Sequence, residues 1–347
     1  MHRPVRPTVI VVIVVVVAVL LGLTGRLPAQ AQSPSGRYVD LVFDRVERTN
    51  DLTFGQAVDR PSGQTIDLKL DLYEPAGDTE AARPVFVFLF GGGFVAGNKE
   101  LEPRAYCELM ARRGYVAVAP SYRINQGDLV SQGIPAAISD ARQAVNWLIA
   151  HAEDHRLDPS RIVIGGSSAG AITALFTAYT DRELQPADRS QRVALVMDLW
   201  GGLYTDVDAM EPGEPPLIII HGTADTVVPF REAEKLRDRA EAVDIPYAFH
   251  PLQGKGHAPY MPAELMTLVA GFAYDRLWAE APTPVVTPTP GATASPNASP
   301  SPTPTDLPTA LPSATNSPAP PSPSAEPGSS PSAAPRHEIR LPYLARG

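Results

Sequence analysis

One serine, one aspartate and one histidine carry the strongest chemical signal in this sequence. Ser168 is the centre of a Gly-x-Ser-x-Gly sequence at residues 166–170, Asp225 follows an apolar run, and His257 lies in a glycine-containing loop. A serine hydroxyl becomes a nucleophile when an imidazole accepts its proton, and a carboxylate orients that imidazole. These three residue types predict acyl transfer through a covalent serine intermediate.

Strand and helix patterns alternate around these residues, which favours a parallel sheet with helices on both faces. Residues 65–73 alternate apolar and polar side chains, as a half-buried antiparallel strand near a sheet edge does. Continuous apolar runs predict strands buried on both faces at 85–90, 116–119, 162–164, 193–197 and 217–220. Helical patterns cover 101–113, 135–151, 169–179, 230–242 and 263–279. The short crossovers leave little room for a large cap domain.

In such a doubly wound sheet, the chemistry is expected at the carboxyl ends of the parallel strands. Ser168 and Asp225 each follow a predicted strand, and His257 follows a strand-like pattern at 247–250, in the chain order that this arrangement favours. His257 would accept the Ser168 proton through one ring nitrogen and donate to Asp225 through the other. The competing base is His250, and the competing acids are Asp206, Asp208 and Asp244.

A second glycine-rich segment, residues 91–93, follows the strand pattern 85–89. Its backbone N–H groups are unobstructed, so they could point at a developing oxyanion together with the N–H of Ala169. A phosphate-binding loop is disfavoured, because no lysine follows at the spacing of a P-loop and no Gly-x-Gly-x-x-Gly is present.

Residues 60–280 resemble the α/β-hydrolase fold, and most resemble the carboxylesterases grouped with hormone-sensitive lipase and with the feruloyl and acetyl-xylan esterases. The resemblance rests on 90–94, 121–123, 134–135, 140–142, 157–170, 221–225 and 256–257. It implies Ser168 as nucleophile, His257 as base and Asp225 as orienting acid, with no metal or organic cofactor. The oxyanion hole would be the backbone of Gly92, Gly93 and Ala169.

One position departs from the pattern of these esterases. They usually carry a histidine before the glycines, where this chain has Phe90. We therefore expect the oxyanion loop to be anchored by packing rather than by a side-chain hydrogen bond. Phe94, Trp200 and Tyr204 flank strand ends and are either walls of a substrate pocket or core residues.

Composition divides the chain and excludes several classes of protein. Residues 281–335 hold 17 of the 38 prolines and only two charged side chains, which predicts a disordered linker after a catalytic domain at 37–280. The net charge of −9 makes nucleic acid an unlikely partner, and the single cysteine, Cys107, excludes a disulfide scaffold.

Both ends of the chain predict export. Arg3 and Arg6 precede an uncharged run at 9–23, and a small-x-small sequence ends at Ala31, so residues 1–31 are interpreted as a signal peptide cleaved there. An uncleaved anchor is the alternative. Residues 336–347 contain a short strand-like pattern that we interpret as a tail for cell-surface attachment, with a non-functional tail as the alternative.

Together these patterns predict a secreted or cell-surface serine esterase that acts on short-acyl esters or on esters borne by a polymer such as a polysaccharide. Two alternatives stay open. One is a serine peptidase of the prolyl-oligopeptidase type, which shares the order of the three residues. The other is a non-catalytic surface-binding module built on a hydrolase scaffold.

Overall fold

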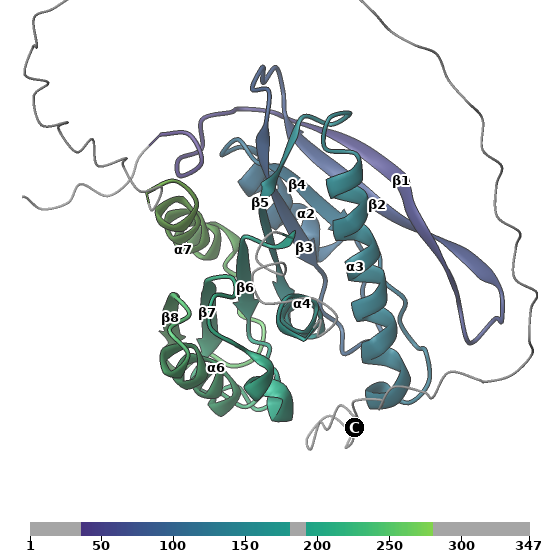
Figure 1. The fold of residues 1–347 in the computed structure, drawn as a ribbon, viewed down its shortest axis with the longest axis vertical. Helices are drawn as coiled ribbons and strands as arrows, with labels where there is room; N and C mark the ends of the chain where they lie inside the picture. Colours follow the sequence, from purple (N-terminus) through teal and green to yellow (C-terminus); the bar gives the residue numbers. More distant parts are fainter. Residues whose placement is uncertain (1–35, 181–191, 280–347) are drawn as a thin grey trace, which may run out of the picture. The chain divides into compact units, whose positions relative to one another are not determined.

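A computed structural model describes residues 36–180 and 192–279 (Figure 1). The predicted signal peptide at 1–31, the linker at 281–335 and the tail at 336–347 lie outside the described residues and stay predictions. In the described ranges, no helix is both long and apolar enough to cross a membrane.

Eight strands form one mixed sheet in the order β1-β2-β4-β3-β5-β6-β7-β8. The pairs β1–β2 and β2–β4 are antiparallel, and every other neighbouring pair is parallel. This is the predicted α/β-hydrolase arrangement, and the fold class is confirmed. The strands are β1 Val46–Val58, β2 Thr65–Pro75, β3 Arg83–Leu89, β4 Val116–Pro120, β5 Leu157–Ser167, β6 Leu195–Leu199, β7 Leu217–Gly222 and β8 Tyr247–Leu252.

Helices follow the parallel strands and cover both faces of the sheet (Figure 1). Buried side chains of α3, α4 and α6 share one hydrophobic core, and those of α2 and α7 share the other. The helices are α2 Glu102–Ala111, α3 Ile134–Ala150, α4 Ala169–Tyr179, α6 Arg231–Ala242 and α7 Pro262–Tyr274. Shorter helical turns are η1 Leu129–Gly133, η2 Tyr204–Ala209 and η3 Asp275–Ala279.

The continuous apolar runs follow from this two-sided burial. Strand β3 is buried at every position, with Val85 and Val87 in one core and Phe86 and Phe88 in the other. Successive side chains of a strand point to opposite faces, so a strand covered on both sides needs apolar residues throughout. Cys107 of α2 is 0% exposed and lies in the second core.

No predicted range covers strand β1. It is a long edge strand with several charged residues, and Phe54 is its one fully buried residue. Its register against β2 shifts between Thr49 and Leu52 and again between Thr53 and Gly55. Such bulges interrupt strict alternation, and for this reason the period-two pattern fails here.

The site lies where the strand order reverses. From β3 the chain moves outward to the neighbouring β4, and it then crosses back to β5 on the other side of β3. Loops that leave β3 and β5 therefore diverge and open a crevice at their carboxyl ends, which is where open α/β sheets bind ligands. The glycine-rich loop after β3 and Ser168 after β5 both lie at this edge.

Candidate active site

Ser168 lies on a sharp turn between β5 and α4. Its φ of 49° and ψ of −116° are values that a non-glycine residue rarely adopts. A side chain at Gly166 or at Gly170 would overlap the carbonyl oxygen of Leu89, at the end of β3. The two glycines of the motif are therefore needed because the adjacent strand passes against the turn.

The structure brings Ser168, His257 and Asp225 together from three strand ends. His257 Nε2 lies 2.9 Å from Ser168 Oγ, and His257 Nδ1 lies 2.7 Å from Asp225 Oδ2. A carboxylate only accepts hydrogen bonds, so Nδ1 carries the proton and Nε2 is left to accept from the serine hydroxyl. This is the proton arrangement that general-base activation of a serine requires.

Asp225 is held as a carboxylate. Its Oδ1 accepts hydrogen bonds from the backbone N–H groups of Val227, at 2.8 Å, and Val228, at 3.0 Å. Burial alone would raise the pKa of this group, but hydrogen bonds from His221, His257 and Val227 outweigh burial and hold the pKa well below its usual value. The carboxylate can therefore orient His257 throughout the neutral pH range.

The competing residues occupy other places. His250 lies on β8 opposite Ile220, and burial lowers its pKa. Asp208 lies in η2 with its side chain 87% exposed and 3.9 Å from Arg239. Within the described chain it is His257 that contacts both Ser168 and an aspartate.

The loop after β3 has a backbone conformation that favours glycine. Gly92 and Gly93 have φ values of 128° and 61°. Among the described residues no acceptor is found for either N–H group. The N–H of Ala169 opens α4, so it has no partner within the helix. These are the three donors that the sequence analysis assigned to the oxyanion hole.

Two side chains anchor this loop, and the expectation of packing alone was incomplete. The Phe90 ring does stack on Tyr122, with centroids 4.1 Å apart. In addition, the Tyr122 hydroxyl donates to the Phe90 carbonyl at 2.6 Å, and Glu102 Oε2 accepts from the Gly91 N–H at 2.8 Å. Tyr122 lies in a segment that carried the family resemblance, whereas nothing in the sequence marked Glu102.

The three candidate pocket walls are core residues. Phe94, Trp200 and Tyr204 are each at most 2% exposed. Trp200 still borders the site, because its ring meets that of His257 edge-on with centroids 6.5 Å apart. All three have positive φ, as Ser168 does, so strained backbone is concentrated around the site.

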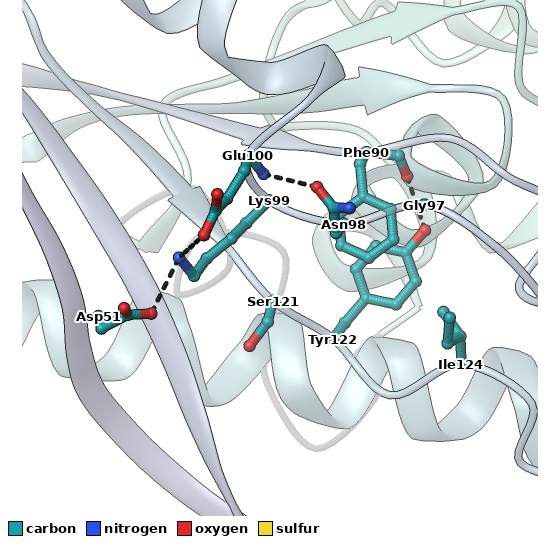
Figure 2. A pocket seen from close by; sticks show the side chains of 9 residues that line it. All are labelled: Asp51, Phe90, Gly97, Asn98, Lys99, Glu100, Ser121, Tyr122 and Ile124. Carbon is teal, nitrogen blue, oxygen red and sulfur yellow. Dashed lines mark hydrogen bonds and ion pairs between the residues drawn. The ribbon is translucent and has the colours of Figure 1, made fainter.

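A cavity of about 330 Å³ adjoins the oxyanion loop (Figure 2). Phe90 and Tyr122 line one side of the cavity. Lys99 lines another side, where it forms ion pairs with Asp51, at 3.0 Å, and with Glu100, at 3.5 Å. The buried Asp71 also contacts Lys99, at 2.8 Å. Acids outnumber the lysine here, which disfavours an anionic occupant.

No metal site is apparent in the part of the chain that the structure describes. Between residues 36 and 180 and between 192 and 279, no group of three or more histidine, cysteine, aspartate or glutamate side chains could hold an ion. His151, which ends α3, instead hydrogen-bonds through Nδ1 to the Trp147 carbonyl at 2.9 Å.

Several of the known proteins that this chain resembles are esterases. Residues 70–212, less than half of the chain, match the model of the BD-FAE family. The chain is 25% identical over 237 residues to the probable carboxylic ester hydrolase LipM of Mycobacterium tuberculosis, covering 54% of each protein. It is 29% identical over 148 residues to an acetyl esterase of Salmonella schwarzengrund, covering 43% of this chain and 42% of that one. The chain thus spans about half the length of these curated relatives.

A solved structure extends the likeness over most of the described residues. Thermogutta terrifontis esterase 2, phosphorylated by paraoxon, is 25% identical with a TM-score of 0.54, covering 68% of this chain and 96% of that one. The expected resemblance to carboxylesterases is therefore confirmed. The chain has the α/β-hydrolase fold, and the relatives described here are carboxylic-ester hydrolases.

Proposed function

We propose that this protein is a serine carboxylesterase. The observation that carries the proposal is the continuous hydrogen-bonded series from Ser168 Oγ through His257 to Asp225, at 2.9 and 2.7 Å. It lies beside backbone N–H groups of Gly92 and Gly93 that have no acceptor in the described part of the chain. Nucleophile, base, orienting acid and oxyanion donors are thus all present at one strand-end crevice.

The reaction proceeds in two balanced halves. Ser168 Oγ attacks the ester carbonyl carbon as His257 Nε2 takes the hydroxyl proton, and the oxyanion is stabilised by the backbone donors. The carbon–oxygen bond to the alcohol then breaks, and His257 returns the proton to the leaving alcohol. Water, deprotonated by His257, attacks the acyl-serine and releases the carboxylic acid and free Ser168.

Short acyl groups are the substrates that the comparisons favour. Forms of Thermogutta terrifontis esterase 2 have been solved with butyrate and with propionate bound. Esters carried by a polymer such as a polysaccharide are the second part of the proposal.

The test is hydrolysis of p-nitrophenyl acetate and butyrate by the wild type and by Ser168→Ala. We expect the substitution to lower kcat by about 10⁴-fold or more, since loss of a triad residue typically does so. Equal rates for both proteins would overturn the proposal. A prolyl p-nitroanilide substrate separates the peptidase alternative, and the binding-module alternative predicts that neither substrate is cleaved.

The rate should also fall as the medium is acidified. His257 Nε2 must be unprotonated to accept the serine proton, while Asp225 stays ionised because hydrogen bonds hold its pKa low despite burial. We therefore expect a single acidic limb in the profile of kcat/KM against pH. A rate that is flat between about pH 5 and 8 would contradict the role of His257 as base.

We further propose that the enzyme is exported, with cleavage after Ala31, and held at the cell surface by its C-terminal tail. The support is the sequence alone: arginines, an uncharged run and a small-x-small site at the start, and a proline-rich stretch before the tail. Mass spectrometry of the mature protein should find Gln32 first, and an intact Met1 would overturn cleavage. Truncation after Glu280 should move the enzyme without lowering its activity, and lost activity would overturn the linker interpretation.

A further inference from the structure

A second imidazole lies against the carboxylate of the triad. His221 is the penultimate residue of strand β7, and its Nε2 lies 3.2 Å from Asp225 Oδ2. This is the same oxygen that His257 Nδ1 contacts at 2.7 Å. The His221 side chain is 0% exposed and meets the Phe230 ring edge-on. One carboxylate oxygen is therefore shared between two histidines, and one of them cannot reach solvent.

The proton on His221 can be assigned from its partners. His221 Nε2 also lies 2.9 Å from the backbone carbonyl of Val228. A carbonyl and a carboxylate both accept and neither donates, so Nε2 must carry the hydrogen. The single Nε2 hydrogen is therefore directed at the Val228 carbonyl, and it faces Asp225 Oδ2 as a second, longer contact, whether the ring is neutral or cationic. His221 Nε2 thus contacts both Asp225 and the carbonyl of Val228. The N–H of Val228 in turn donates to the other carboxylate oxygen of Asp225, Oδ1, at 3.0 Å.

A buried carboxyl group, that of Asp198, lies near the imidazole of His221. Asp198 pairs in register with Ile219 across β6 and β7, so its side chain points to the same sheet face as His221. Gly201 N–H donates to Asp198 Oδ1 at 2.8 Å. Asp198 Oδ2 and His221 Nδ1 are both buried without a hydrogen-bond partner in the described chain. Asp198 is thus a buried acid close enough to His221 to act on it through charge.

The remaining titratable neighbours leave this arrangement intact. Tyr204 of η2 is buried near Asp198 and Asp225, and burial together with nearby acids raises its pKa, so it stays a neutral phenol. Glu232 of α6 is neutralised by Lys235, at 2.9 Å. His250 of β8 pairs with Ile220 and so points to the opposite face from His221. Asp198, Asp225 and His257 are left as the groups that act on His221.

We propose that His221 is a positioning residue of the esterase, which orients Asp225 and, by sharing Oδ2, weakens the hold of that carboxylate on His257. The inference rests on the proposed function. An N–H that donates to a carboxylate draws off part of the negative charge available to a second donor. Without His221, Asp225 would attract a protonated His257 more strongly while being less well fixed in direction.

The test compares two substitutions of similar size. In His221→Gln the amide nitrogen can take the place of Nε2 and donate to Asp225, whereas His221→Met fills the space without a donor. The measurements are the profile of kcat/KM against pH for p-nitrophenyl acetate and the melting temperature. Should the methionine variant not fold, His221→Asn, whose side chain is too short to reach Asp225, takes its place.

We expect His221→Met to lower kcat/KM by about 10- to 100-fold, as loss of an orienting partner does, and to move the acidic midpoint upward by about half a pH unit or more. His221→Gln should keep the wild-type midpoint and most of the rate. A packing role alone would change the melting temperature and leave both midpoints at the wild-type value, which would overturn the proposal.

Failure of this inference can be separated from failure of the esterase proposal. We expect the imidazole proton between His257 Nδ1 and Asp225 Oδ2, 2.7 Å apart, to give a downfield nuclear magnetic resonance signal in the absence of substrate. We expect this signal to shift in His221→Met and to stay in place in His221→Gln, whether or not esters are the substrate. An unchanged signal in both variants would overturn the role of His221, while hydrolysis that does not depend on Ser168 would overturn the esterase alone.

Discussion

The two sides of Ser168 differ in the chemical groups that they present: backbone groups on one side and ionisable side chains on the other. On the β3 side the site consists of main chain: Gly92 and Gly93 present N–H groups, and Gly166 lets β3 pass against the nucleophile turn. On the side of β6, β7 and β8 it consists of buried ionisable side chains, with Asp225 between two histidines and Asp198 behind them.

Because of this difference, we expect the two sides to respond differently to substitution. A backbone donor cannot be removed by changing a side chain, so the β3 side is altered through shape and through its anchors Glu102 and Tyr122. The other side is altered through charge and proton position, and its changes should appear in pH profiles. The predictions below test this division, beginning with the largest effect.

Removal of the base should have the largest effect. His257→Ala leaves Ser168 without a proton acceptor, so we expect kcat to fall by about 10⁴-fold or more. The matched control is His250→Ala, which removes a half-buried histidine from β8 that contacts neither Ser168 nor Asp225 in the described structure. Steady-state hydrolysis of p-nitrophenyl butyrate measures both, and comparable losses would show that the wrong histidine has been assigned.

The second largest effect on activity is expected from a change in the shape of the loop after β3. A Cβ at Gly92 would overlap the Ala96 carbonyl, so Gly92→Ala must displace the loop and its donors. We expect kcat to fall by about 10²- to 10³-fold, the usual value of one oxyanion donor. In Gly93→Ala the added carbon meets nothing closer than Val95 at 4.0 Å, so the substitution adds the strain of a positive φ but no overlap, and it should lose much less. Equal losses of kcat in the two variants would show that the conformation of Gly92 does not position an oxyanion donor.

Smaller effects are expected from the anchors of the loop. Glu102→Ala removes the acceptor of the Gly91 N–H and should lower kcat by about 10-fold, since the donors next to it become less well placed. Glu102→Gln retains an oxygen that can accept the same hydrogen bond and should stay near the wild type. If KM alone changed in Glu102→Ala, the residue would bind substrate instead of holding the loop.

The smallest effect on activity, and a distinct one on stability, is expected at Asp198. Burial raises the pKa of this carboxyl from its ordinary value to about 6. Its folded form thus favours the proton, so its contribution to stability is complete below about pH 4 and is lost as the pH rises through 6, by at most about 3 kcal/mol. Asp198→Asn keeps the oxygen that binds Gly201 but cannot ionise.

The free energy of unfolding of Asp198→Asn, relative to the wild type, should therefore rise between about pH 4 and pH 7. Urea unfolding at a series of pH values measures this difference. A difference that is independent of pH would mean that Asp198 is ionised, or neutral, across the whole range.

The sequence predicted those parts of the fold and site that depend on local pattern. The runs in β3 and β7 are apolar because both faces are covered, and the glycines around Ser168 are required by a turn that the sequence itself encodes. The strand order then placed Ser168, Asp225 and His257 at one edge without any knowledge of side-chain contacts.

What the sequence did not show depends on contacts between distant segments. Glu102 binds the loop at Gly91 only because α2 begins beside it, and β1 is hidden by its bulges. His221 was read as part of a motif that ends in Asp225, but nothing local says that its ring turns inward to share that carboxylate. Aromatic residues at strand ends, such as Tyr204, turned out to be core, because proximity to a site along the chain does not determine exposure.

The most direct test of the account is to trap the nucleophile. Incubation with paraoxon followed by peptide mapping should find one phosphoryl adduct per chain, on Ser168, with loss of ester hydrolysis in proportion to labelling and no adduct in His257→Ala over the same time. An adduct on any other residue, or full hydrolysis by a protein labelled at Ser168, would contradict it.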